Sequence, residues 1–126
     1  MREIVDAAGA PAAIGPYSHA VRSGGLLFCS GQIAIDPQTG ELVGETPATQ
    51  VRQCLDNLAA VCEAAGATLA DAVRVTVYLT DMQAFAAVNG EYASYFGDKA
   101  PARVLVGVTA LPKDALIEVE AVVAVD

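Results

Sequence analysis

Basic side chains are scarce in this sequence, which has seven lysines and arginines against 15 aspartates and glutamates. The formal net charge of −8 repels a phosphate backbone, so nucleic acid is not an expected partner. Uninterrupted apolar runs of about 18 residues, the length that a membrane helix needs, are also missing. The N-terminal stretch MREIVDAAGAP has neither a secretory nor a transit-peptide pattern. We therefore expect a soluble cytoplasmic protein with no membrane partner.

Cysteine and histidine are equally few. Cys29, Cys54 and Cys62 form no Cys-x-x-Cys pair, and His19 is the single histidine, so neither disulfides nor a metal site are expected. Cys54 and Cys62 share one face of a predicted helix, where free cysteine packs as a small apolar side chain. A nucleophilic Cys29 or Ser30 with His19 as its base is a weak alternative, because nothing in the sequence activates the thiol. Glycine-rich phosphate-binding spacings are absent.

The sequence does contain a regular succession of strand and helix patterns. No repeat or linker divides it, and 54% of the residues are hydrophobic, which predicts a single domain over residues 1–126. The segment YSHAVRSGGLLFCSGQIAI predicts two short strands joined by a tight turn at residues 23–25. Thr46 and Pro47 begin a predicted helix, which Gly66 ends.

The second half of the chain continues this succession. Residues 73–79 alternate apolar and polar side chains, which predicts a strand whose apolar face comprises Val73, Val75, Val77 and Leu79. Asp81 caps a second predicted helix, with an apolar stripe of Phe85, Val88, Tyr92 and Phe96. Two strands follow, at residues 104–108 and 116–125. This order of elements indicates an α+β fold.

The last two predicted strands are apolar on both faces, whereas two helices can cover only one face of a sheet. No further helix remains to cover the second face. A second copy of the chain is the economical cover, since most soluble oligomers are symmetric assemblies of one chain. We therefore expect a homo-oligomer packed sheet to sheet.

Charged residues interrupt these strands. Counting by twos places Arg103, Leu105 and Gly107 on one side of a strand. A guanidinium on an apolar wall needs a partner, because burying that charge unpaired is costly. Its planar fork fits either an internal carboxylate, from Glu118 or Glu120, or the carboxylate of a ligand. A position at the edge of the sheet, from which the side chain reaches water, is a further structural alternative.

Other polar residues extend the candidate site. Glu118 and Glu120 share one strand face, where partial burial of an unpaired acid raises its pKa and suits it to proton transfer or to orienting a water. An edge strand with one solvated face is the structural alternative. Asn89, at the margin of the second helix's apolar stripe, either binds a ligand or caps a loop. Ser30 and Gly31 end a strand, and Gly31 allows a backbone or a ligand to approach closely.

Four motifs occur together between Ala12 and Val125: IGPYSHAV, SGQIAIDPQTGELV, QVRQCLDNL and PARVLVGVTALPKDALIEVEAV. In this combination they resemble the reactive intermediate deaminase family, also called RidA or YjgF. The resemblance implies a chorismate-mutase-like fold with a mixed six-stranded sheet and two helices on one face, assembled as a homotrimer with ligand sites between subunits. It also implies a 2-iminobutanoate/2-iminopropanoate deaminase, which hydrolyses enamine and imine acids such as 2-aminoacrylate to 2-keto acids and ammonia without a cofactor.

By the same resemblance, Arg103 clamps the substrate carboxylate and Glu118 holds the attacking water. The remaining positions that match the family's substrate cleft are Tyr17, Ser30, Gly31, Asn89 and Leu105. Many active relatives have a cysteine where this chain has Leu105. If this chain is active, the cysteine side chain is not required, the backbone N–H or C=O of residue 105 is the group left to bind a ligand, and we expect a changed substrate preference. A non-catalytic trimer that binds small carboxylates, with a regulatory or protective role, is the alternative. A ribonuclease function, sometimes ascribed to this family, conflicts with the net charge of −8.

Overall fold

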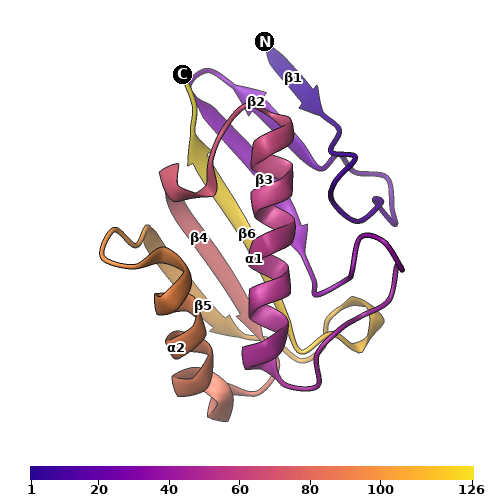
Figure 1. Ribbon diagram of the computed structural model, residues 1–126, viewed down its shortest axis with the longest axis vertical. Helices are drawn as coiled ribbons and strands as arrows, with labels where there is room; N and C mark the ends of the chain where they lie inside the picture. Colours follow the sequence, from indigo (N-terminus) through magenta and orange to yellow (C-terminus); the bar gives the residue numbers. More distant parts are fainter.

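The computed structural model describes residues 1–126 and contains one six-stranded sheet with two helices packed against one of its faces (Figure 1). The strand order is β1-β2-β3-β6-β4-β5. Strands β4 and β5 are parallel and all other neighbours are antiparallel, because the chain crosses over between β4 and β5 through a helix. The mixed sheet and its two helices confirm the predicted α+β fold.

The elements have the following bounds. The strands are β1 (Arg2–Val5), β2 (Ala20–Ser23), β3 (Leu26–Gln32), β4 (Ala72–Leu79), β5 (Ala102–Gly107) and β6 (Ile117–Ala124). The helices are α1 (Pro47–Ala64) and α2 (Phe85–Phe96). Short 3₁₀ turns lie at Leu69–Asp71, Met82–Ala84 and Pro112–Asp114. Neither helix combines the length and apolar character that crossing a bilayer requires.

Helix boundaries follow the predicted signals closely. Thr46 caps α1 in a capping box with Thr49, and Pro47 occupies the first helical position. Gly66 has φ of +73° just beyond the final turn, the left-handed conformation that glycine adopts without steric cost. Asp81 accepts a hydrogen bond from the backbone N–H of Gln83, so it caps the 3₁₀ turn that leads into α2 rather than α2 itself.

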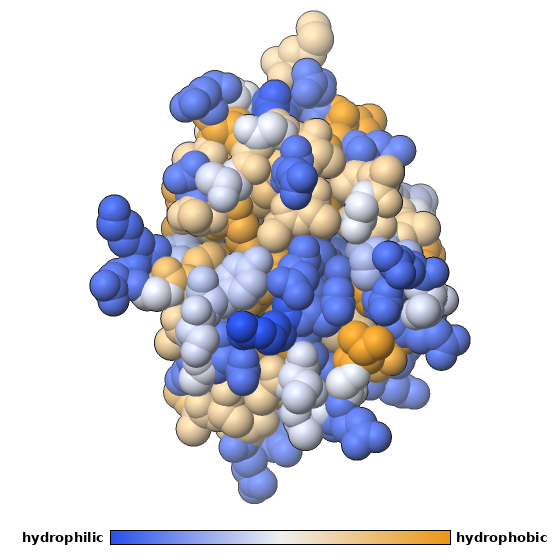
Figure 2. All heavy atoms as spheres, viewed as in Figure 1, coloured by the Kyte–Doolittle hydropathy of each residue, from blue (hydrophilic) through white to orange (hydrophobic).

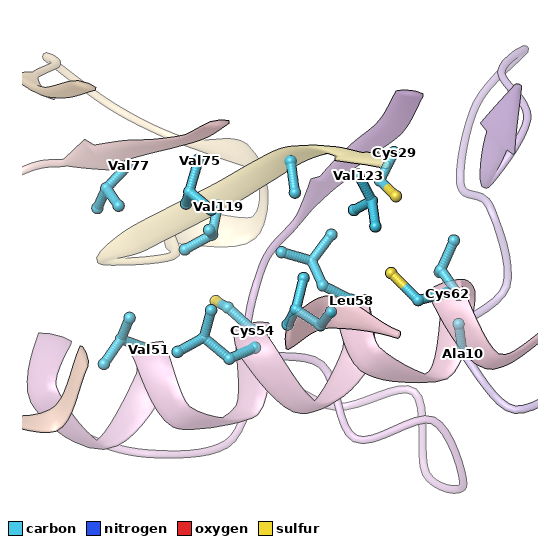
Figure 3. Close-up of a cluster of buried hydrophobic side chains, with 14 of the residues drawn as sticks. Ala10, Cys29, Val51, Cys54, Leu58, Cys62, Val75, Val77, Val119 and Val123 are labelled. Carbon is cyan, nitrogen blue, oxygen red and sulfur yellow. The ribbon is translucent and has the colours of Figure 1, made fainter. Parts of the chain in front are cut away.

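The core lies between α1 and the sheet (Figure 3). Val51, Cys54, Leu58 and Cys62 project from α1 toward the sheet, and all four are fully buried. They meet side chains from three strands, among them Cys29, Val75, Val77, Val119 and Val123. The cysteines of α1 therefore pack as small apolar residues, as predicted.

Val73 departs from the predicted pattern. The pairing of β4 with β6 shifts register between Ala72 and Arg74, and this irregularity interrupts the alternation at the start of β4. Val73 is 45% exposed as a result, whereas Val75, Val77 and Leu79 are fully buried. The placement of Val73 on the apolar face was wrong, because sequence periodicity cannot anticipate a bulge set by the neighbouring strand.

The two faces of the molecule differ in character. On the helix face, hydrophilic side chains gather over the middle of α1 (Figure 2). On the opposite face the sheet has no cover, and large apolar side chains are exposed there, including Leu26, Phe28, Val104 and Val106. An exposed apolar sheet face of this kind is typical of a surface that packs against another chain.

Candidate active site

A hollow of about 380 Å³ opens where the end of β3 meets the start of β6. Its lining residues are Ile14, Tyr17, Ser30, Gly31, Ile33, Pro112, Glu118 and Glu120. Four of the predicted site residues are therefore brought together here: Tyr17, Ser30, Gly31 and Glu118. The pairing of β3 with β6 shifts register between Cys29 and Gln32, so Ser30 and Gly31 lie in an irregular segment that is not paired with β6. On the other side of β3, the backbone N–H of Ser30 still donates to the carbonyl oxygen of His19 at 3.0 Å.

The Glu118 carboxylate has no hydrogen-bond or ion-pair partner within the chain, although the residue is half-buried. Burial, and to a lesser extent the nearby charge of Glu120, raises the pKa of Glu118 above the ordinary value for a carboxyl group. An acid with a raised pKa is a stronger base when it is ionised. The site therefore holds a group suited to accept a proton from water.

Gly31 is what allows Glu118 to occupy this place. A Cβ atom at position 31 would come within 3.0 Å of the Glu118 carboxyl carbon and closer still to Oε2. Any side chain at position 31 would therefore displace the carboxylate. The sequence predicted that a backbone or a ligand approaches Gly31, whereas the group that lies against it in this chain is the side chain of Glu118.

The other polar groups around the hollow are engaged. The Tyr78 hydroxyl donates a hydrogen bond of 3.0 Å to Oε1 of Glu120, which gives Glu120 the partner that Glu118 lacks. The Ser30 hydroxyl donates to the carbonyl oxygen of Ser18 at 2.6 Å. The Tyr17 hydroxyl accepts a hydrogen bond of 3.3 Å from the backbone N–H of Ile14, which holds the tyrosine beside the opening.

Arg103 lies apart from this hollow, beneath α2. Its Nη1 donates a hydrogen bond of 2.8 Å to Oδ1 of Asn89, and no carboxylate lies within ion-pair distance of its guanidinium. The alternative of an internal ion pair between Arg103 and Glu118 or Glu120 is therefore wrong. Asn89, in turn, neither caps a loop nor stands free, since it accepts from Arg103.

Strand register explains this separation. Arg103 of β5 aligns with Val75 of β4, which aligns with Ala121 of β6, and cross-strand partners share one face of a sheet. Val75 is buried under the helices, so Arg103 belongs to the helix face. Glu118 aligns with Tyr78 on the opposite face. Leu105, two residues after Arg103, packs half-buried against the core on the helix side.

The nucleophilic alternative has no support in the geometry. Both ring nitrogens of His19 are engaged, since Nδ1 accepts from the backbone N–H of Ala7 at 2.9 Å and Nε2 donates to the carbonyl of Pro11 at 2.8 Å. Cys29 faces Cys62 inside the core, and the hydrogen bond with Cys62, followed by burial, raises the pKa of Cys29 well above the ordinary value for a thiol. No group of three or more potential ligand side chains is placed to hold a metal ion.

Three residues of the hollow were not identified from the sequence, namely Ile14, Ile33 and Pro112. Ile14 precedes Tyr17 in a loop and is 57% exposed, and loop conformation has no periodic signal. Pro112 opens a turn in which Lys113 and Asp114 both have positive φ, at 58° and 57°. Two consecutive non-glycine residues in this region are uncommon, and such backbone is often found at functional sites. The only sequence signal for this turn was the Leu111-Pro112 pair.

The chain is similar to known proteins in both sequence and fold. Residues 7–125 match the family model described as Endoribonuclease L-PSP. A RutC family protein of Pyrococcus horikoshii is 53% identical over 122 residues, which cover 97% of each chain. The fold matches the YjgF gene product of E. coli with a TM-score of 0.91 and 43% identity, covering 97% of this chain and 98% of that one. RidA from an Antarctic Psychrobacter matches with a TM-score of 0.93 and 39% identity, covering 98% and 99% of the two chains.

Proposed function

This chain belongs to the RidA/YjgF/RutC family, and we propose that it hydrolyses reactive enamine and imine acids to 2-keto acids and ammonia. The proposed substrates are 2-aminoacrylate, 2-iminopropanoate and 2-iminobutanoate. One observation carries the proposal: the chain presents an arginine without a carboxylate partner and a glutamate without any partner, on opposite faces of the same sheet. A 2-imino acid supplies what both lack, a carboxylate for Arg103 and an electrophilic carbon for a water held by Glu118.

In the proposed homotrimer, Arg103 of one subunit lies beside Glu118 of another. In a closed ring of three copies, each chain offers its Arg103 surface to one neighbour and its Glu118 hollow to the other, which gives three equivalent clefts. The exposed apolar side chains of the open sheet face, among them Phe28 and Val106, supply the surface that such an assembly buries. The proposed substrate contacts are then Arg103, Asn89 and Leu105 from one subunit, with Tyr17, Ser30 and Gly31 from the next.

The proposed reaction needs only water. An enamine such as 2-aminoacrylate first takes a proton from solvent at its terminal carbon, which gives the protonated imine. This imine is electrophilic, and the Arg103 fork holds its carboxylate so that the imine carbon faces the water. As the new C–O bond forms, the Glu118 carboxylate takes the proton from the water. Glu118 then returns this proton to the nitrogen of the tetrahedral adduct. The C–N bond breaks, ammonia leaves, and loss of the hydroxyl proton yields the 2-keto acid.

Leu105 favours a second candidate, a trimer that binds small carboxylates without turnover. An apolar side chain replaces the cysteine that the resemblance leads one to expect, and it packs against the core. β5 is an edge strand, so the backbone N–H and C=O at position 105 are the groups that would bind a ligand there. In this candidate, Arg103 still binds a carboxylate, but no imine is hydrolysed.

A coupled assay tests the proposal. A serine or threonine dehydratase generates the enamine in place, semicarbazide competes for the imine, and 2-keto acid formation is followed with and without the protein. Acceleration by catalytic amounts of protein is the expected result. Absence of acceleration for every amino acid supplied, together with tight binding of 2-keto acids, would instead establish the binding protein. An RNA-cleaving activity that persists unchanged in Arg103→Ala would be assigned to a contaminant.

A further inference from the structure

Three residues of α2 surround the Arg103 side chain. Phe85, Asn89 and Tyr92 are spaced four and three residues apart, so they form one stripe along the helix, above β5. The guanidinium carbon lies 4.8 Å from the centroid of the Tyr92 ring and 5.9 Å from that of the Phe85 ring. From sequence, both aromatic residues had been assigned to the core stripe. The structure gives them a second role, as an aromatic wall against a cation.

No carboxylate of the chain lies within ion-pair distance of the Arg103 guanidinium, so the aromatic rings are the groups that stabilise its charge. Arg22 and Arg52 each lie beside a glutamate, whereas Arg103 has only the neutral amide of Asn89. The negative faces of aromatic rings attract a guanidinium within about 6 Å, most strongly where water is excluded. Tyr92 is only 5% exposed, so its ring is shielded from water, while Arg103 is half-buried and keeps part of its side chain open.

The ring of Tyr92, rather than its hydroxyl, makes this contact. The buried hydroxyl oxygen has no hydrogen-bond partner. The nearby Arg103 charge lowers the pKa of Tyr92 less than burial raises it, so the phenol remains neutral. A neutral phenol without a partner offers the cation its π face and nothing more.

We propose that Tyr92, assisted by Phe85, is a positioning residue for the carboxylate-binding guanidinium of Arg103. The rings pack against the guanidinium, and the side-chain oxygen of Asn89 accepts from one of its five N–H donors. The remaining donors are left in a fixed fork for a carboxylate, so the entropy of ordering the arginine is lost on folding rather than on binding. This inference rests on the proposed function, since it assigns the residues that prepare the clamp of that site.

Tyr92→Leu tests the inference, with Tyr92→Phe and Phe96→Leu as matched controls. Phe96 packs against Tyr92 at a centroid distance of 4.8 Å, with the two rings tilted by 45°, and is not among the rings that contact Arg103. Its replacement therefore perturbs the same cluster without touching the guanidinium. We expect Tyr92→Leu to raise the KM of the imine, and the Kd of 2-oxobutanoate measured by calorimetry, by about five- to thirty-fold with kcat nearly unchanged. Tyr92→Phe and Phe96→Leu should keep wild-type KM and Kd.

The outcomes separate this inference from the proposed function. If wild-type protein neither turns over imines nor binds 2-oxobutanoate, the proposed function fails. If wild type is active and Tyr92→Leu behaves like Phe96→Leu, only the positioning role is overturned. An equal loss in Tyr92→Phe would assign the effect to the hydroxyl and would also overturn it. Should Tyr92→Leu fail to fold, Phe85→Leu serves in its place, because Phe85 is 40% exposed, with a smaller expected rise in KM.

Discussion

Arg103 and Glu118 project from opposite faces of one sheet, and each lacks a charged partner within its own chain. β4 lies between β5, which carries Arg103, and β6, which carries Glu118. The buried Val75 of β4 aligns with Arg103, and the half-exposed Tyr78 of β4 aligns with Glu118. No side-chain rotation can bring the two groups together through a hydrogen-bonded sheet. A site that uses both must therefore be completed by another copy of the chain, and this requirement guides the predictions below.

Arg103→Lys separates a ligand clamp from a structural cation. Lysine keeps the charge and loses the bidentate fork, so we expect activity to fall about 10- to 100-fold. The melting midpoint should change little, because Arg103 bridges to no carboxylate in the fold. Both quantities are measured on one preparation. A lowered midpoint with full activity per folded molecule would show that the arginine serves the framework.

Glu118→Gln should abolish most activity, by about 10²- to 10⁴-fold, because the amide cannot accept the proton from water. The same change should stabilise the protein at neutral pH. Since the folded protein raises the pKa of Glu118 above its ordinary value of 4.5, its ionisation opposes folding, and the contribution of Glu118 to wild-type stability falls as pH rises from about 4.5 through the raised pKa. The gain in melting midpoint should therefore vanish near pH 4. A gain that is constant with pH would refute the buried-acid explanation.

Gly31→Ala should displace the Glu118 carboxylate. The added Cβ would overlap the end of that flexible side chain, so we expect a loss of activity with little change in unfolding free energy, because the displaced carboxylate has no partner to lose. Gly9→Ala is the matched control, because a Cβ there meets only Ala60 at 3.9 Å. Chemical denaturation and the coupled assay measure both effects. Unchanged activity in Gly31→Ala would mean that the position of Glu118 is not critical.

Phe28→Glu tests assembly through the open face of the sheet. Phe28 is 46% exposed in the single chain, and a charge in an apolar interface between subunits should prevent the homotrimer from forming. Light scattering should report a trimer for wild type and for Asp56→Lys, a change on the exposed side of α1. A stable wild-type monomer on dilution would contradict the assembly and, with it, the composite site.

Much of the fold was predictable because its signals are local. The capping of α1 by Thr46, its termination near Gly66 and the alternation from Val75 to Leu79 each depend on residues close in sequence. The structure confirms all three. Local signals failed at Val73, where pairing with β6 sets the bulge, and at Phe85, which is 40% exposed beside Arg103 instead of buried in the core.

The sequence by itself determined the class of fold, the family and, away from bulges such as the one at Val73, the facing of side chains along the strands. It placed Glu118 and Glu120 together on one face of β6 and Arg103 with Leu105 on one face of β5, because alternation along a strand has a period of two. Only the tertiary structure decided how those faces relate, since register between β4, β5 and β6 depends on contacts between residues far apart in the chain. For the same reason, it alone put the Glu118 carboxylate against Gly31 and the Tyr92 ring against the guanidinium of Arg103.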